Sequence, residues 1–233
     1  MCCATKTLMG LYHLKRYAPV SPLYWTRHLP LDRVLYSPHM VLHLIQSREE
    51  FGPEERRAEL RTVWRMNDAV FADQTHPEGR PTFSEMFRMC KPAAFNIIAN
   101  SDIYFSPHTF DGFDDRWFDV RVCMALSRWD VLPNGEVKLH DHCDSQDSWI
   151  VYGGPHEVDA PFPMGVPGCD NALLYSLQVA GFKVSNPSKT IRTYHLHNSA
   201  HRTYLSDENG HGRGGKKMYR IPPPYAFAKP TEL

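Results

Sequence analysis

Four groups of polar residues have types and spacings that could support catalysis. An acid at the end of a buried strand, together with a histidine from another strand, would form a mixed oxygen and nitrogen site suited to Mn²⁺ or Mg²⁺. The remaining coordination positions would then be open to the phosphate oxygens of a substrate. In chain order the groups are Asn100-Ser101-Asp102, Asp144 with Asp147, Gly168-Cys169-Asp170-Asn171, and Tyr194-His195-Leu196-His197 with Asn198, His201 and Arg202.

The first group ends at Asp102. Apolar sequence begins at Phe95, stops at Asn100-Ser101-Asp102 and resumes through Phe105. We expect a buried strand that presents the Asp102 carboxylate at its tip, because a sheet fixes the backbone while the loop leaves the side chain accessible to a cation. The structural alternative is a buried strand that ends in a polar turn.

The last group contains two histidines at alternate positions. In a strand His195 and His197 would point to the same face, so the pair could supply one or two metal ligands without a helix. Taken singly, a histidine in a strand is more often structural.

Asp170 and Asp147 are carboxylates in different contexts. Asp170 begins a predicted helix after the glycine- and proline-rich residues 162–168. The structural interpretation is an N-cap, and the functional one is a general base at the lip of a pocket. Asp147 precedes an apolar run, much as Asp102 follows one. Both Asp147 and Asp144 could bind substrate hydroxyls or be surface acids.

Apolar runs of strand length are interspersed with segments of helical periodicity, which predicts an α/β fold. Helices are expected from Pro53 to about residue 70, from Thr82 to about Cys90 behind a Thr82–Glu85 capping box, and from Asp170 to Gly181. Strands are expected at residues 40–45, 70–73, 95–105, 120–126, 149–152, 183–185 and 190–196, with a hairpin at 129–139 whose tip is Asn134-Gly135.

Composition limits the class of protein. A chain of 233 residues, 42% of them hydrophobic, can bury the core of one domain. Lys+Arg and Asp+Glu are equal at 26 each, so no overall basic field indicates nucleic-acid or membrane binding. Six cysteines without a CxxC pair favour a reducing compartment. With no secretory signal pattern and no membrane-length apolar run, we expect a soluble, cytoplasmic protein without a membrane partner.

The chain divides into three parts by pattern. Residues 1–39 predict an irregular N-terminal segment, residues 40–205 the catalytic domain, and residues 206–233 a loop-rich, loosely attached tail. The tail carries basic residues that would suit a polyanion, although charged tails are usually only solvated. They are His211, Arg213, Lys216, Lys217 and Arg220. The oligomeric state is left open.

Four sequence blocks, taken together, resemble a nucleotide-sugar-dependent glycosyltransferase of the GT-A type. They are NSDIYF, ALSRWDV, SQDSWIVY and FPMGVPGCDNALLYSLQVAGFKVSNPSKTIRTYHLHNSAHRTY. The resemblance implies a GT-A-like, Rossmann-related mixed sheet flanked by helices. It also implies a divalent metal cofactor, a nucleotide-sugar donor and an inverting transfer to a hydroxyl acceptor.

The resemblance also implies roles for individual residues. Asn100-Ser101-Asp102 matches a DxD-like motif that binds the metal and the donor phosphates, with Asp102 the stronger metal ligand. Asp170 takes the place of the catalytic base, and His197, with His195 close behind, that of a metal-binding histidine. Asp147 would lie near the donor sugar or the acceptor hydroxyls. Further donor contacts are assigned by position alone to Arg192 and Arg202 for the diphosphate, and to Gln46, Asn67 and Asp73 for the nucleoside.

Three alternatives remain open at this point. The acceptor could be a glycan, a small molecule, a protein or a modified base in DNA. The same acids and histidines could serve a metal-dependent hydrolase of a phosphorylated or nucleotide-sugar substrate. The chain could also be a non-catalytic module that binds a sugar or nucleotide.

Overall fold

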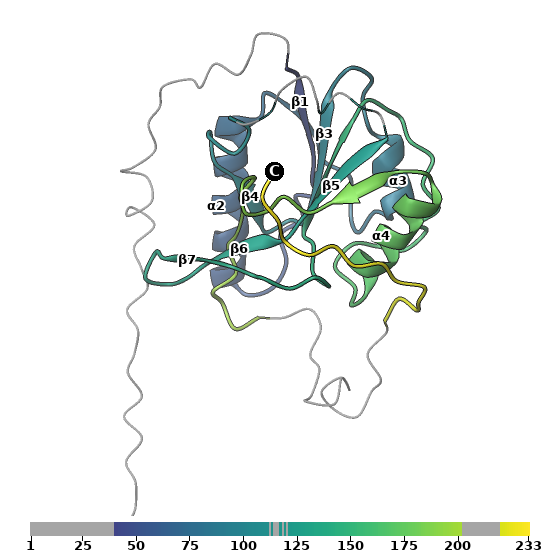
Figure 1. Ribbon diagram of the computed structural model, residues 1–233. Helices are drawn as coiled ribbons and strands as arrows, with labels where there is room; N and C mark the ends of the chain where they lie inside the picture. The colour runs from purple at the N-terminus through teal and green to yellow at the C-terminus, as the bar shows by residue number, and fades with distance from the viewer. Residues whose placement is uncertain (1–39, 112, 114–116, 118, 120, 202–219) are drawn as a thin grey trace, which may run out of the picture. The chain divides into compact units, whose positions relative to one another are not determined.

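The computed structural model describes residues 40–111, 113, 117, 119, 121–201 and 220–233, and these form the expected α/β fold (Figure 1). The predicted segment 1–39 and the tail through residue 219 lie outside the described residues. Ten strands form two sheets, and three helices lie against them in this part of the chain.

The larger sheet is mixed and has the strand order β2-β1-β3-β8-β5-β9. Its strands are β1 (Leu42–Ile45), β2 (Asp73–Thr75), β3 (Phe95–Ala99), β5 (Val122–Leu126), β8 (Ser148–Tyr152) and β9 (Lys183–Ser185). Strand β8 is antiparallel to β3 and β5, whereas β2, β1 and β3 are parallel, as are β5 and β9. The chain passes from β1 to β2 on one side and then to β3 on the other, so the strand order reverses at β1.

The smaller sheet has the order β4-β10-β6-β7. Its strands are β4 (Ile103–Phe105), β6 (Arg128–Val131), β7 (Val137–Leu139) and β10 (Thr193–His195). Strands β6 and β7 form the predicted hairpin around Asn134-Gly135. Strand β10 is antiparallel to β4 and parallel to β6, which brings the segment with the two histidines beside the segment that follows Asp102.

The helices mostly follow the sequence signals. Helix α2 is Glu54–Val70, α3 is Phe83–Arg88 and α4 is Cys169–Val179. The Thr82–Glu85 capping box is present at α3. The prediction of a strand at residues 70–73 was wrong, because α2 continues through Val70 and the strand begins at Asp73. Asp170 is not the N-cap of α4: Gly168 occupies that position with φ 80, a left-handed backbone that glycine adopts without strain.

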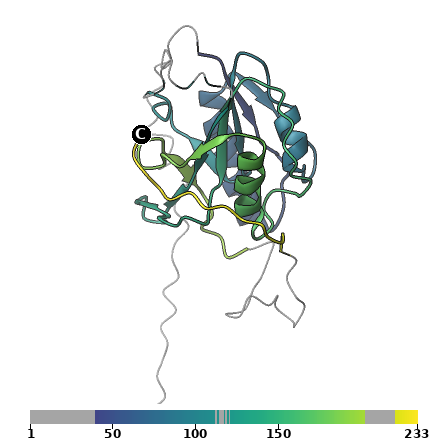
Figure 2. The same cartoon turned by 45° about the vertical axis from the view of Figure 1, so that its right-hand side comes forward.

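Alternation along the central strands buries both faces of the larger sheet. Ile98, Ala125 and Trp149 belong to one apolar cluster, together with residues of α3 and α4, which lie on the same side of the sheet (Figures 1 and 2). Their neighbours Ile97 and Ile150 belong to a second cluster on the opposite face. Because side chains alternate between faces with a period of two, continuous apolar strands indicate a sheet covered on both sides.

The C-terminal residues 220–233 pack against the domain, so the prediction of a loosely attached terminus was wrong for them. Ile221 is 3% exposed, and the backbone N–H of Ala226 donates to the carbonyl of Asn171 in α4. Figure 2 shows this segment running across the domain beside α4. The apolar residues among its prolines, rather than its charge pattern, decide its attachment.

Within the described residues, no helix combines the length and the apolar character needed to cross a membrane. Cys90, Cys123, Cys143 and Cys169 are free thiols, and three of them are buried.

Candidate metal centre and active-site pocket

The turn that carries Asp102 is held by the side-chain amides of two buried residues. Gln46, directly after β1, donates from Nε2 to the carbonyls of Asn100 at 2.7 Å and Ile103 at 2.8 Å. Asn67 of α2 donates from Nδ2 to the same Ile103 carbonyl and to Oε1 of Gln46. The turn therefore leaves β3 in one defined conformation. Both amides hold the turn and Asp73 pairs with Lys91, so all three residues have structural partners. None of the three lines the pocket in front of Asp102.

Asp102, His195 and His197 come together at this turn. Oδ2 of Asp102 lies 3.2 Å from Nε2 of His195 and 3.4 Å from Nδ1 of His197. One ligand atom from each residue lies within 4.8 Å of the other two. In the sheet, His195 is the register partner of Ile103, the residue after Asp102. The fold thus joins two segments that are more than ninety residues apart.

The second nitrogen of each histidine is held by a hydrogen-bond acceptor. Nε2 of His197 lies 2.6 Å from the carbonyl oxygen of His201, which can only accept, so Nε2 carries the hydrogen. Nδ1, the other ring nitrogen of His197, faces Oδ2 of Asp102. Nδ1 of His195 lies 2.8 Å from Oδ1 of Asp130, which leaves Nε2 toward Asp102. Two oriented imidazoles and a carboxylate form a donor set that could hold a divalent cation.

Arg56 of α2 completes the surroundings of Asp102. Its guanidinium is 1% exposed and donates from Nη2 to Oδ2 of Asp102 at 2.6 Å and from Nη1 to the carbonyl of Leu196. Burial would raise the pKa of Asp102, but His195, then His197 and Arg56, outweigh that effect and hold the pKa well below its usual range. Asp102 is therefore an anion, as a metal ligand must be.

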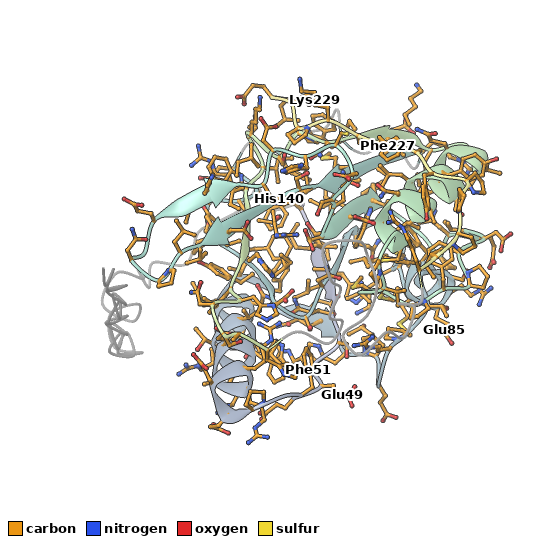
Figure 3. The ribbon with its side chains drawn as sticks, turned by 90° about the horizontal axis from the view of Figure 1, so that it is seen from below. Glu49, Phe51, Glu85, His140, Phe227 and Lys229 are labelled. Carbon is orange, nitrogen blue, oxygen red and sulfur yellow. The ribbon has the colours of Figure 1, made fainter. Side chains whose placement is uncertain are left out.

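A pocket of about 470 Å³ opens in front of this group. Its walls come from the ends of β1 and β3, from β6, and from the loops before α3 and α4. Glu49 and Phe51, labelled in Figure 3, line it from the segment between β1 and α2. The pocket is also lined by Ser47, Arg56, Arg80, Asn100, Ser101, Asp102, Arg128, Asp130, Asp147, Met164, Gly165, His195 and His197.

Asp147 lines the pocket next to the turn. Its Oδ1 accepts from Nδ2 of Asn100 at 2.7 Å, and its Oδ2 accepts from Nη1 of Arg128 at 2.9 Å. The backbone N–H of Asn100 also donates to the carbonyl of Asp147. Asn100 is therefore oriented by Asp147. Asp147 as a whole residue is 8% exposed, and it lines the pocket.

Asp170 lies in the first turn of α4, which follows the loop that carries the lining residues Met164 and Gly165. Its Oδ1 accepts from the N–H of Asn171, and its Oδ2 accepts from that of Gln146 at 3.4 Å. Burial, and then the negative charge of Asp147, raise its pKa to about 6. Asp170 is not among the lining residues of the pocket, in contrast to the position at its lip that the sequence predicts.

The two arginines assigned by position to the diphosphate have different outcomes. The guanidinium carbon of Arg192 lies 4.3 Å from the ring centroid of Trp129, and Arg192 does not line the pocket. Its structural partner is thus an aromatic ring. Arg202 lies outside the described residues.

Five charged residues of the pocket were not predicted from the sequence: Glu49, Arg56, Arg80, Arg128 and Asp130. Arg56 lies in a helix whose other charged residues are exposed or half-buried, and nothing in its sequence context indicates burial. Asp130 was predicted only as part of the hairpin at 129–139, and Arg128 was named only within the block ALSRWDV, although their spacing of two places both side chains on one face of β6. Alternate charges within a short strand were the available signal.

In comparisons with known proteins, no family model matches the sequence, and no curated protein is significantly similar to it.

Proposed function

We propose that the chain is a metal-dependent, inverting glycosyltransferase that moves a sugar from a nucleotide-sugar donor to a hydroxyl acceptor. The observation that carries this proposal is the convergence of Asp102, His195 and His197 at the end of β3, with one ring nitrogen of each histidine toward the Asp102 carboxylate. A mixed carboxylate and imidazole set suits Mn²⁺, with Mg²⁺ as the alternative ion.

The position of the pocket supports a nucleotide-type ligand. In open α/β sheets, ligands bind outside the carboxyl ends of the strands where the strand order reverses. Here that place lies between β1 and β3, and Ser47, Asn100 and Asp102 from these strand ends line the pocket. Arg80 and Glu49 on the adjacent loops provide one cation and one anion for the polar parts of such a ligand.

The proposed reaction forms a bond between the acceptor oxygen and the anomeric carbon, and it breaks the bond from that carbon to the diphosphate. A bound divalent cation supplies charge neutralisation of the departing diphosphate. Asp170 accepts the proton of the acceptor hydroxyl, and its pKa of about 6 suits a base that works near neutral pH. Asp147, fixed by Asn100 and Arg128, binds sugar hydroxyls.

The proposal is tested first by a thermal-shift screen of nucleotide sugars with and without Mn²⁺. A ligand that binds the folded state raises the apparent stability by mass action. We expect one donor to raise the melting temperature only when Mn²⁺ is present. That donor is then incubated with glycans, small molecules, proteins and modified DNA. A screen without any Mn²⁺-dependent stabilisation contradicts the proposal.

A metal-dependent hydrolase is the second candidate. Two histidines and one carboxylate are also a common ligand set of catalytic zinc. The two functions separate when the donor found in the screen is supplied with acceptors: a transferase forms a glycosylated product, whereas a hydrolase releases free sugar regardless of the acceptor. Release with Zn²⁺ and no product with any acceptor would favour the hydrolase.

DNA carrying a modified base is one acceptor class with its own test. Binding to duplex DNA depends on salt, since each neutralised phosphate releases counterions. Affinity that stays constant between about 50 and 200 mM salt counts against DNA as the acceptor.

A further inference from the structure

The pocket contains an acid that the proposed reaction does not use. Asp130 lies in β6 and is the register partner of His195 in the parallel pair of β6 and β10. Register partners in neighbouring strands project to the same face of a sheet. Oδ1 of Asp130 accepts the Nδ1–H of His195 at 2.8 Å, so this contact follows from the strand pairing itself.

Asp130 is held in turn by the residue two positions before it. Arg128 donates from Nε to Oδ1 of Asp130 at 2.8 Å and from Nη1 to Oδ2 of Asp147 at 2.9 Å. The Asp130 carboxylate is 34% exposed, but this arginine restricts its movement. On its other oxygen, Nδ1 of His140, labelled in Figure 3, lies 3.8 Å away. Arg128 therefore connects the histidine side of the pocket with its carboxylate side.

We propose that Asp130 is a positioning residue for the metal centre, an inference that rests on the proposed function. Asp130 contacts neither the cation nor the substrate. It holds the Nδ1–H of His195, which fixes the ring orientation and presents Nε2 as the ligand atom beside Oδ2 of Asp102. Carboxylates that hold the second nitrogen of a metal-binding histidine typically contribute 10- to 100-fold to metal affinity.

The other histidine shows why Asp130 is the residue to vary. His197 has its Nε2–H held by the carbonyl of His201, a backbone group that no substitution removes. His195 relies on a side chain for the same purpose. Each histidine thus has a hydrogen-bond acceptor at its second ring nitrogen, a backbone carbonyl for His197 and a carboxylate for His195. Of these two acceptors, only the carboxylate can be removed by mutation.

The test measures Mn²⁺ affinity by calorimetry in the absence of nucleotide, with electron paramagnetic resonance of the bound ion. Asp130→Ala should weaken Mn²⁺ binding by about 10- to 100-fold. Asp130→Asn keeps an acceptor oxygen for Nδ1–H and should recover most of that loss. Glu136→Gln removes an exposed acid from the same hairpin and should leave affinity unchanged.

A double variant separates positioning from a general structural role. His195→Ala alone should weaken Mn²⁺ binding, and adding Asp130→Ala should cause no further loss if Asp130 acts through His195. A further loss in the double variant overturns the proposal. So does unchanged affinity in Asp130→Ala, provided that the wild type binds Mn²⁺. A wild type that binds no divalent ion, by contrast, refutes the metal centre and with it the proposed function.

Discussion

Asp102 and Asp170 are two carboxylates of one pocket region whose surroundings act in opposite directions. Both are largely buried, and burial alone would raise the pKa of each. Around Asp102, two histidines and Arg56 reverse that effect and keep the carboxylate ionised. Asp170 has only backbone N–H donors and a second acid, Asp147, nearby, so its pKa rises to about 6.

The difference between the two pKa values suggests different chemical roles for two residues of the same type. A carboxylate that is an anion at every physiological pH suits a cation ligand. A carboxylate that titrates near neutral pH suits proton transfer. Pairs of titratable groups whose environments separate their pKa values commonly mark an active site.

The largest expected effect comes from removing the ionised member of the pair. Asp102→Ala should abolish metal-dependent donor binding. The loss of affinity should exceed the roughly 100-fold that is typical when a residue hydrogen-bonded to a metal ligand is removed, because Asp102 would be a ligand itself. Because the buried Arg56 would lose one of its ion pairs and keep the one with Glu59, we also expect about 1–3 kcal/mol of destabilisation. Donor titrations with and without Mn²⁺ measure the first effect, with the exposed Asp111→Ala as control. Donor binding that still requires Mn²⁺ in Asp102→Ala would remove Asp102 from the metal centre.

The second expected effect isolates the base. Asp170→Asn should reduce transfer by about 10²- to 10⁴-fold, the usual contribution of general base catalysis, and should leave Mn²⁺ and donor affinity unchanged. Single-turnover transfer assays measure it, and Asp144→Asn replaces a nearby exposed acid as the matched control. Retained transfer in Asp170→Asn would exclude this residue as the base.

The same substitution should change stability in a pH-dependent way. The folded pKa of Asp170, about 6, exceeds its ordinary value of 3.8, so the folded state holds this proton more tightly than the unfolded state. Its stabilising contribution is therefore present below pH 3.8 and is lost as the pH rises through 6. At pH 8, Asp170→Asn should raise the free energy of unfolding by about 1–3 kcal/mol, and by much less at pH 4. Urea unfolding at the two pH values checks this; equal gains at both would refute the pKa assignment.

The smallest effect concerns the coupling between the two acids. Asp147→Asn removes the charge that helps raise the pKa of Asp170, so the acid limb of the transfer rate should move to lower pH by less than about one unit. The position of the limb, not the height of the profile, is the informative quantity. A limb that stays in place would mean that burial alone sets this pKa.

Much of the local structure followed from short-range signals. The Asn134-Gly135 hairpin, the Thr82–Glu85 capping box and the helix that contains Asp170 all depend on residues that are near one another in the chain. Two errors, the strand predicted at residues 70–73 and the N-cap predicted at Asp170, concern the boundaries of elements. The others arose where long-range packing decides. The turn after β3 takes its partners from Gln46 and Asn67, and the C-terminal segment packs beside α4 despite its many prolines and polar residues.

The sequence alone determined which side chains are available: an acid at a strand end, two histidines in alternation, and an acid at a helix start. Only the tertiary structure decided which of them meet. The pairing of β10 with β4 and β6 places His195 between Asp102 and Asp130, and His195, His197 and Arg56 together keep Asp102 ionised. Charge state depends on neighbours brought together by the fold, because an electrostatic interaction decays with distance in space and not with separation along the chain.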